Sequence, residues 1–349
     1  NKRYDIGVRN GVSDAEVAAA RLGTVRRDGK YGDAYLIHKV LGLDYKSKIS
    51  TLRGDYRLAD GSVANRLRQW SKSDFRPLPE DIIQERIYCI QWMRPKPIGK
   101  GSVYEFRAVT PEDLTREWVI ERYLEDHIED WQRAGWVPDM RIEVGGPPRY
   151  QGLDLVRARG WTHWHHLFTP RQLLIAALLC RESGASGRIL LCRALNRSSK
   201  LSGWDASQEA VNQVFINQAL NTQYNYACRA LGGLENFLSI DDTPVEHFSE
   251  TKFEVRCHPA ASVSEPISIF VSDPPYGDAV KYEEITDFFI AWLRKNPPPE
   301  FADWTWDSRR SLAIQGEGED FRRQMVSAYK RMGACMPDNG IQVVMFTHQ

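Results

Sequence analysis

The 349-residue chain has no excess of charge of either sign. Its 46 lysines and arginines balance 46 aspartates and glutamates, so the formal net charge is zero. A globally basic nucleic-acid binder is therefore not indicated, and any phosphate contacts must come from local clusters of basic residues. No apolar run is long enough to span a bilayer, and nothing resembles a signal peptide. We expect a cytoplasmic protein with no membrane partner.

The chain also lacks paired cysteines. Its six cysteines are scattered singly, without a C-x-x-C pair. This spacing argues against a zinc ribbon and against the disulfide framework of a small secreted domain. It favours a reducing compartment, in agreement with a cytoplasmic location.

One long helix is predicted over residues 111–136. Thr110 supplies an N-cap hydroxyl, and Pro111 stands at the first helical position. Apolar residues then recur at helical spacing and form a stripe: Leu114, Trp118, Ile120, Tyr123, Leu124, Ile128 and Trp131. Before this helix the chain contains short segments with many turn formers, so residues 1–110 read as a mixture of small elements.

A linker follows the helix, because residues 145–148 have the sequence Gly-Gly-Pro-Pro. We place the domain boundary there. The prediction is an α+β accessory region over residues 1–149 and a second domain over residues 150–349.

The second domain alternates helix and strand patterns. Strands separated by helices imply an α/β fold with a mostly parallel, Rossmann-like sheet that is covered on both faces. Ligands of such sheets bind beyond the carboxyl ends of the strands. The predicted helices begin at Thr169-Pro170 and span 212–231, 288–293 and 321–332, and the predicted strands span 188–192, 253–257, 267–271 and 341–346.

Basic and aromatic residues are interleaved between positions 66 and 107. This pattern suits contact with nucleic acid, and the competing interpretation is a solvated basic face over an aromatic core. The residues are Arg66, Arg68, Lys72, Arg76, Arg86, Arg94, Lys96, Lys100 and Arg107, with Trp70, Phe75, Tyr88, Trp92, Tyr104 and Phe106 among them.

The tetrapeptide Asp273-Pro274-Pro275-Tyr276 follows the strand predicted at 267–271. The exocyclic amine of a nucleic-acid base is a poor nucleophile, and it gains electron density when its two hydrogens are bonded. The Asp273 carboxylate and the Pro274 carbonyl can accept those hydrogens, because two prolines fix the backbone and remove donors. Tyr276 offers a face on which a flipped base can stack. The tetrapeptide thus indicates amine methylation from S-adenosylmethionine without a metal; the alternative is a rigid turn.

Further segments accompany the tetrapeptide, and together they resemble large bacterial adenine-specific DNA methylases, including members found in anti-phage gene clusters. The resemblance covers residues 150–349 well and residues 20–95 more loosely. It implies methyl transfer to adenine N6 in double-stranded DNA, with other defence-system proteins as further partners. The matching segments are Gly160–Leu174, Asn217–Thr222, Tyr282–Arg294 and Val343–His348.

These methylases carry a glycine-rich loop of the form D-P-F-x-G-x-G that lets the backbone approach the cofactor, and no such loop occurs here. The chain starts at Asn1 and stops just after a predicted strand, so we expect a piece of a longer protein with the loop upstream. A second interpretation assigns cofactor binding to Phe168, Thr169 and Pro170, with 188–192 as a degenerate first strand.

Four more residues are predicted to border the base. Tyr282 and Asp287 follow the tetrapeptide, and Thr347 and His348 end the last strand. For Tyr282 and Asp287 the competing interpretation is a polar helix start near the helix dipole. Four polar residues follow the strand predicted at 188–192 and could meet phosphate or substrate, or simply add to loop polarity: Arg193, Asn196, Arg197 and Lys200.

Three histidines, His163, His165 and His166, lie together in the sequence. Their spacing of one and two residues, without a nearby cysteine or pair of carboxylates, fits no common metal site. We predict no metal, and a structural or DNA-facing role for the three rings.

The sequence therefore predicts an S-adenosylmethionine-dependent DNA adenine-N6 methyltransferase. Cytosine N4 stays open because the same geometry serves both amines, and methylation of RNA or of a protein amide uses related tetrapeptides. A different class is a non-catalytic DNA-recognition subunit of a defence or restriction-modification complex, which the missing glycine loop favours.

Overall fold

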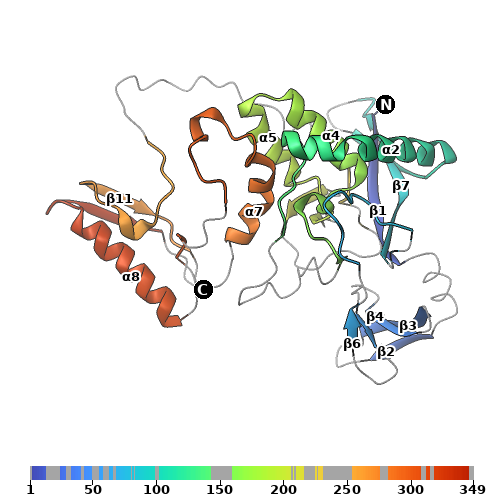
Figure 1. Ribbon diagram of the computed structural model, residues 1–349, viewed down its shortest axis with the longest axis horizontal. Helices are drawn as coiled ribbons and strands as arrows, with labels where there is room; N and C mark the ends of the chain where they lie inside the picture. The colour runs from blue at the N-terminus through green and yellow to red at the C-terminus, as the bar shows by residue number, and fades with distance from the viewer. Residues whose placement is uncertain are drawn as a thin grey trace. The chain divides into compact units, whose positions relative to one another are not determined.

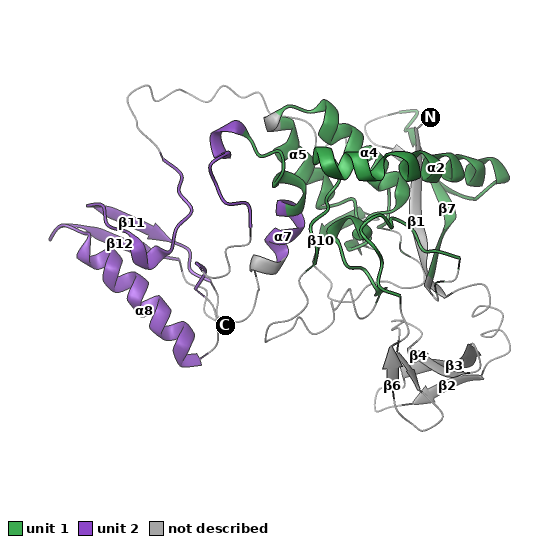
Figure 2. Ribbon diagram, in the orientation of Figure 1, with its two compact units in different colours: residues 1–240, 291–298 green, residues 241–290, 299–349 purple. Residues whose placement is uncertain are grey.

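The computed structural model divides into two compact units (Figures 1 and 2). Unit 1 comprises residues 1–240 and 291–298, and unit 2 comprises residues 241–290 and 299–349. The boundary predicted at residue 149 lies outside the described residues. Those residues are 2–12, 24–28, 33–40, 43–48, 55–57, 63–65, 68–79, 81, 83–98, 102–142, 159–205, 207, 210–215, 225, 227–230, 254–275, 282–307, 312–314 and 318–345, with backbone only up to residue 65.

Unit 1 begins with two antiparallel sheets. One has the strand order β2-β3-β4-β5-β6, and the other has the order β1-β7-β8 with the long central strand β7. Residues 82–92 fit either a helix or a strand by sequence, and most of them form β7. The strands are β1 (Lys2–Val12), β2 (Thr24–Asp28), β3 (Asp33–Val40), β4 (Leu43–Lys48), β5 (Asp55–Arg57), β6 (Val63–Asn65), β7 (Ile83–Pro95) and β8 (Ser102–Ala108).

Helix α2 (Pro111–Ala134) confirms the predicted helix and its cap. The Thr110 hydroxyl accepts the Asp113 backbone N–H at 3.3 Å, and the Asp113 carboxylate accepts the Thr110 N–H at 3.0 Å. The helix ends at Gly135, which has the left-handed φ of 78°. The first part of the chain therefore contains both sheets, which end with β8, and a long helix, α2.

Helix α4 (Pro170–Glu182) begins where the sequence predicted, with Thr169 as its N-cap. The next segment corrects the prediction, because 188–192 is not a strand but part of helix α5 (Ala185–Leu195). Leu191, Ala194 and Leu195 are buried at helical spacing. The apolar run thus continues as a helix face.

A short 3-10 helix, η1 (Trp164–Leu167), precedes α4, and two strands follow α5. Strands β9 (Ser202–Asp205) and β10 (Ala210–Val214) form an antiparallel pair. The helix predicted over 212–231 is therefore wrong at its start, and residues 227–230 are not helical either. The rest of that range, apart from residues 213–215 and 225, lies outside the described residues.

Hydrogen bonds join residues 68–76 to residues 160–166, the segment before α4, and we call this contact the clasp. The Trp70 N–H donates to the Gly160 carbonyl at 2.8 Å, and the Thr162 hydroxyl donates to the Trp70 carbonyl at 2.5 Å. Gly160 has a φ of 76°, and a Cβ there would lie 2.0 Å from the Arg68 carbonyl oxygen. Glycine is therefore required where the two segments cross.

Unit 2 contains a parallel pair of strands, β11 (Ile269–Ser272) and β12 (Ile341–Val344). Ile269 pairs with Ile341, and Ser272 with Val344, so the carboxyl ends of the two strands meet. Both strands were predicted, but the strand predicted at 253–257 is wrong, because residues 254–257 are neither strand nor helix. The other elements are η2 (Ala260–Ser262), α7 (Tyr282–Leu293, which ends in unit 1), η3 (Pro299–Phe301) and α8 (Gly318–Ala334).

The two faces of the β11–β12 pair differ. On one face Gln342 donates to the sulfur of Met332, near the end of α8, at 3.4 Å. On the other face Ile269 and Val271 are 61% and 66% exposed. Parallel sheets in proteins are usually covered on both faces, so this apolar face is unusual.

The fold is mixed α/β with small sheets, of which the β11–β12 pair is parallel and the paired strands of unit 1 are antiparallel. Within the described part of the chain, no helix combines the length and the apolar character needed to cross a membrane.

Candidate functional site

The tetrapeptide begins directly after β11. The Met345 N–H donates to the Ser272 carbonyl at 2.8 Å, which extends the parallel ladder to the residue before Asp273. Asp273 is exposed, Pro274 is buried, and Pro275 is half-buried. An exposed carboxylate on a buried proline anchor thus stands where parallel strands end, the usual ligand position in such sheets. Tyr276 lies outside the described residues.

The four residues predicted to border the base are only partly described. Tyr282 is the first residue of α7, with only its backbone described, and Asp287 lies in the same helix with 2% of its surface exposed. Thr347 and His348 lie outside the described residues, after β12. The assignment of all four residues to a base pocket stays a prediction.

Burial divides the residues predicted to bind cofactor. Phe168 is fully buried, and its ring lies edge-to-face to Trp292 with the centroids 5.2 Å apart. The Thr169 hydroxyl accepts the Gln172 N–H at 3.2 Å as the cap of α4. Thr169 and Pro170 also line a cavity, so of the three residues only these two can face a ligand.

Two of the three histidines, His165 and His166, bond to residues 68–76 and so belong to the clasp. The Nε2–H of His165 donates to the Asp74 carbonyl at 2.9 Å, and that of His166 donates to the Ser71 carbonyl at 3.0 Å. Nδ1 of His166 accepts the Thr162 N–H at 3.1 Å. Burial lowers the pKa of both rings, that of His165 to about 3, so they are neutral structural groups. Within the described part of the chain, no cluster of ligating side chains could hold a metal ion.

The basic and aromatic stretch between 66 and 107 has two environments. Trp70 and Phe75 are core residues, as the competing interpretation expects, whereas Tyr104 and Phe106 on β8 are each 46% exposed. Arg68 is bonded to Asp81 at 2.8 Å. The stretch is thus partly core and partly surface, and contact with DNA stays a prediction.

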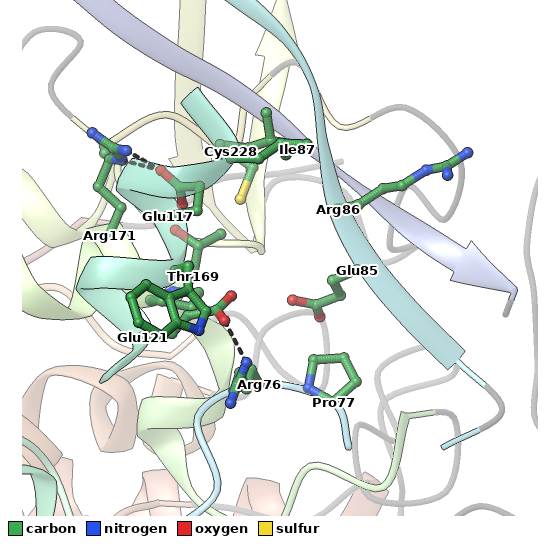
Figure 3. A pocket seen from close by; sticks show the side chains of 14 residues that line it. Arg76, Pro77, Glu85, Arg86, Ile87, Glu117, Glu121, Thr169, Arg171 and Cys228 are labelled. Atoms are coloured by element: carbon green, nitrogen blue, oxygen red, sulfur yellow. Dashed lines mark hydrogen bonds and ion pairs between the residues drawn. The ribbon is translucent and has the colours of Figure 1, made fainter. Parts of the chain in front are cut away.

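A cavity of about 210 Å³ lies in unit 1, between α2, β7 and the start of α4 (Figure 3). Leu114 and Trp118, one turn apart on α2, supply an apolar wall. Both remain more than half exposed, at 53% and 58%. Large apolar side chains this exposed at the wall of a cavity leave a surface on which a ligand could lie.

Three carboxylates reach the same cavity, and each has a cationic partner. Glu117 is bonded to Arg171 at 2.8 Å, and Glu121 is bonded to Arg76 (Figure 3). The Glu85 carboxylate points toward the cavity in Figure 3. It lies 2.6 Å from the ammonium of Lys200, which is 1% exposed. Burial raises the pKa of Glu121, although Arg76 opposes the shift.

Lys200 therefore does not stand in a polar loop that faces phosphate. Its ammonium lies 4.8 Å from the ring centroid of Trp161 and 5.4 Å from that of Trp70.

The cavity was not predicted from the sequence, because its walls come from β7, α2 and the start of α4. The available signal was the acidic pair Glu117 and Glu121, one turn apart beside Trp118.

Comparisons of this chain with protein-family models, with curated proteins and with solved structures found no match.

Proposed function

We propose that the chain is part of an S-adenosylmethionine-dependent methyltransferase that acts on the amino group of a DNA base, adenine N6 in the first instance. The observation that carries the proposal is the exposed Asp273 carboxylate on a buried proline, directly after β11 in a parallel pair. The buried Pro274 fixes the backbone directly beside Asp273, so the turn holds the carboxylate at the end of the strand ladder. Positioned acceptors at the carboxyl end of parallel strands suit a ligand that must be oriented.

The turn would act by holding the amine. The Asp273 carboxylate accepts one amine hydrogen and the Pro274 carbonyl the other, which directs the nitrogen lone pair at the methyl donor. S-adenosylmethionine, when bound, would supply the methyl group on a sulfonium, whose sulfur would leave as the nitrogen takes the methyl carbon. The nitrogen then gives up a proton, for which Asp273 is the acceptor at hand.

A larger sheet around β11 and β12 belongs to the same proposal. Ile269, Val271, Ile341 and Val343 share one exposed face of the pair. Such a face supports a mostly parallel, Rossmann-like sheet with further cover, because isolated two-stranded pairs are marginally stable. Of the residues named for the cofactor only Thr169 and Pro170 line a cavity, and the strand 188–192 that would precede the cofactor is a helix. The residues of this chain therefore form no complete cofactor site within the part that the structure describes.

The test is transfer of labelled methyl groups to mixed-sequence duplex DNA by the complete gene product, followed by digestion to nucleosides. We expect N6-methyladenine from the unmodified protein. Asp273→Ala should lower its formation roughly 100-fold or more, because a positioned polar group is lost from the reacting centre. Asp338→Ala, an exposed aspartate elsewhere in unit 2, is the matched control and should keep full activity.

The alternative assignments give different products. Formation of N4-methylcytosine would assign cytosine as the methylated base, and label in RNA or protein would assign a different class of substrate. DNA binding without any methyl transfer would replace the enzyme with the non-catalytic recognition subunit that the missing glycine loop favours. Equal activity of Asp273→Ala and the unmodified protein would remove the role assigned to the turn.

A further inference from the structure

We propose that the cavity of unit 1 binds a nucleobase that carries an amino group, with its ring against Trp118 and its amine bonded to Glu121. The inference deepens the proposed function, on which it rests for the choice of nucleic-acid chemistry. The cavity lies in unit 1 and the Asp273 turn in unit 2, so each site can be tested without the other.

The wall on α2 favours a flat ring. Trp118 and Leu114 are spaced by four residues, so they lie on one face of the helix. Both line the cavity and both are more than half exposed. An indole face against an aliphatic neighbour is a stacking surface, and stacking on aromatic side chains accepts any base.

The charges of the cavity argue against an ion as the ligand. Glu85, Glu117 and Glu121 are each paired with a cation, namely Lys200, Arg171 and Arg76 in that order. The pairs neutralise one another, and the side chain of Arg86, the remaining charged residue of the lining, points away from the cavity in Figure 3. Among the described lining residues there is therefore no unpaired charge facing the cavity to attract a phosphate or an ammonium. A neutral ligand with polar edges fits such a wall better.

The polar edge includes carboxylate acceptors beside the arginines that pair with them. A carboxylate offers about four acceptor positions, so Glu121 can take a ligand N–H while it keeps its bond to Arg76. Amino groups of adenine, cytosine and guanine are such donors, whereas thymine and uracil have no amine. Hydrogen bonds to charged acceptors are worth more than neutral ones, so the amine should decide affinity.

Size and rigidity agree with a single ring system. The cavity holds about 210 Å³, below the roughly 300–1,000 Å³ of sites for drug-sized ligands. The carboxylates are fixed by their ion pairs, which reduces the entropy lost on binding. The same base chemistry is presented by a free nucleoside or cofactor and by an unpaired base in a strand, and the experiment separates the two sources.

The experiment titrates the whole chain into 2-aminopurine riboside, whose fluorescence falls on stacking. We expect saturable quenching. Trp118→Ala should weaken binding roughly 5- to 150-fold, the range for loss of one stacking contact. Glu121→Gln should weaken it roughly tenfold or more. Val119→Ala is the control, because Val119 is exposed on the same helix and does not line the cavity.

Competition identifies the ligand. Adenosine should displace the probe at least about tenfold better than purine riboside, which lacks the amine. Displacement by S-adenosylhomocysteine but not by a short single-stranded oligonucleotide assigns the cavity to a free nucleoside, and the reverse assigns it to a base in a strand. Absence of saturable quenching, or equal affinity of Trp118→Ala and Val119→Ala, overturns the proposal. Since the readout is binding, that failure leaves the methylation assay of Asp273 untouched.

Discussion

The ammonium of Lys200 lies 2.6 Å from the carboxylate of Glu85, and the two side chains are only 1% and 6% exposed. The pair joins β7 to the turn after α5, segments 115 positions apart in the sequence. Transfer of two charges out of water is costly, and the pair persists only because each charge has the other and Lys200 also lies over two indole rings.

The first prediction concerns this ion pair. Lys200→Met leaves a carboxylate buried without its cation, so the free energy of unfolding should fall by about 3–5 kcal/mol. Glu85→Gln should cost a similar amount. The double variant should cost clearly less than the sum of the two, because no charge is then left alone. Urea unfolding of the four proteins measures the coupling. Strict additivity would contradict the contact, and Arg322→Met, in an exposed pair on α8, should change little.

The second prediction concerns Gly160. Alanine at this position would have a left-handed φ and a Cβ 2.0 Å from the Arg68 carbonyl oxygen. We expect Gly160→Ala to lower the free energy of unfolding by more than about 2 kcal/mol, since the left-handed conformation alone costs about 1–2 kcal/mol. Gly184→Ala is the control, because Gly184 has a φ of −67° and no atom lies within 4 Å of a Cβ built there. Since Gly184 is the N-cap of α5, its substitution should cost a smaller amount, about 1 kcal/mol or less. Equal unfolding midpoints for the two variants would contradict the clasp.

Local rules predicted two helix starts in this chain, those of α2 and α4. Thr110 and Thr169 each stand before a proline, and both cap their helices as the sequence indicated. The cap rule needs only a few neighbouring residues, and so it can be read without the fold. The strand predicted at 188–192 failed for the opposite reason. A short apolar run fits either a buried strand or one side of a helix. In the structure Leu191 and Leu195 are both buried on one side of α5, so the run is helical.

The two candidate sites also differ in whether local sequence could predict them. The Asp273 turn follows a strand in sequence and could be found from the sequence alone. The cavity could not, because Glu85, Trp118 and Thr169 come from three elements. Periodicity also placed Trp118 in the apolar stripe of α2, although it is 58% exposed. Which apolar residues of a helix are covered depends on what the rest of the chain brings against them.

The third prediction is a loss of stability in acid. Burial lowers the pKa of His165 to about 3, with the charge of His163 as a smaller cause. The unfolded chain binds this proton below about pH 6.5, and the folded chain does not until about pH 3. The unfolded state therefore holds more protons between these values, and stability falls as the pH falls. From His165 alone the loss should reach roughly 2 kcal/mol at pH 5.

The pH dependence has its own control. The pKa of His166 is lowered by the same burial, so the two rings act in the same direction. Urea unfolding between pH 7 and pH 5 measures the slope, which His165→Gln should reduce by up to one proton because the titrating group is gone. An unchanged slope in that variant would assign the acid sensitivity to other groups.

The last prediction separates stability from binding at Thr169. Its hydroxyl accepts the Gln172 N–H, while its own N–H donates to the Gln172 side chain at 3.0 Å. Thr169→Ala removes the first bond and should cost about 1 kcal/mol of unfolding free energy. Thr169→Ser keeps the hydroxyl and should recover most of that loss. Both variants retain Trp118 and Glu121, so both should bind 2-aminopurine riboside with nearly the affinity of the unmodified chain. Serine that fails to restore stability would contradict the cap. Serine that restores stability but not affinity would place the Thr169 methyl group in the cavity as a contact of the ligand.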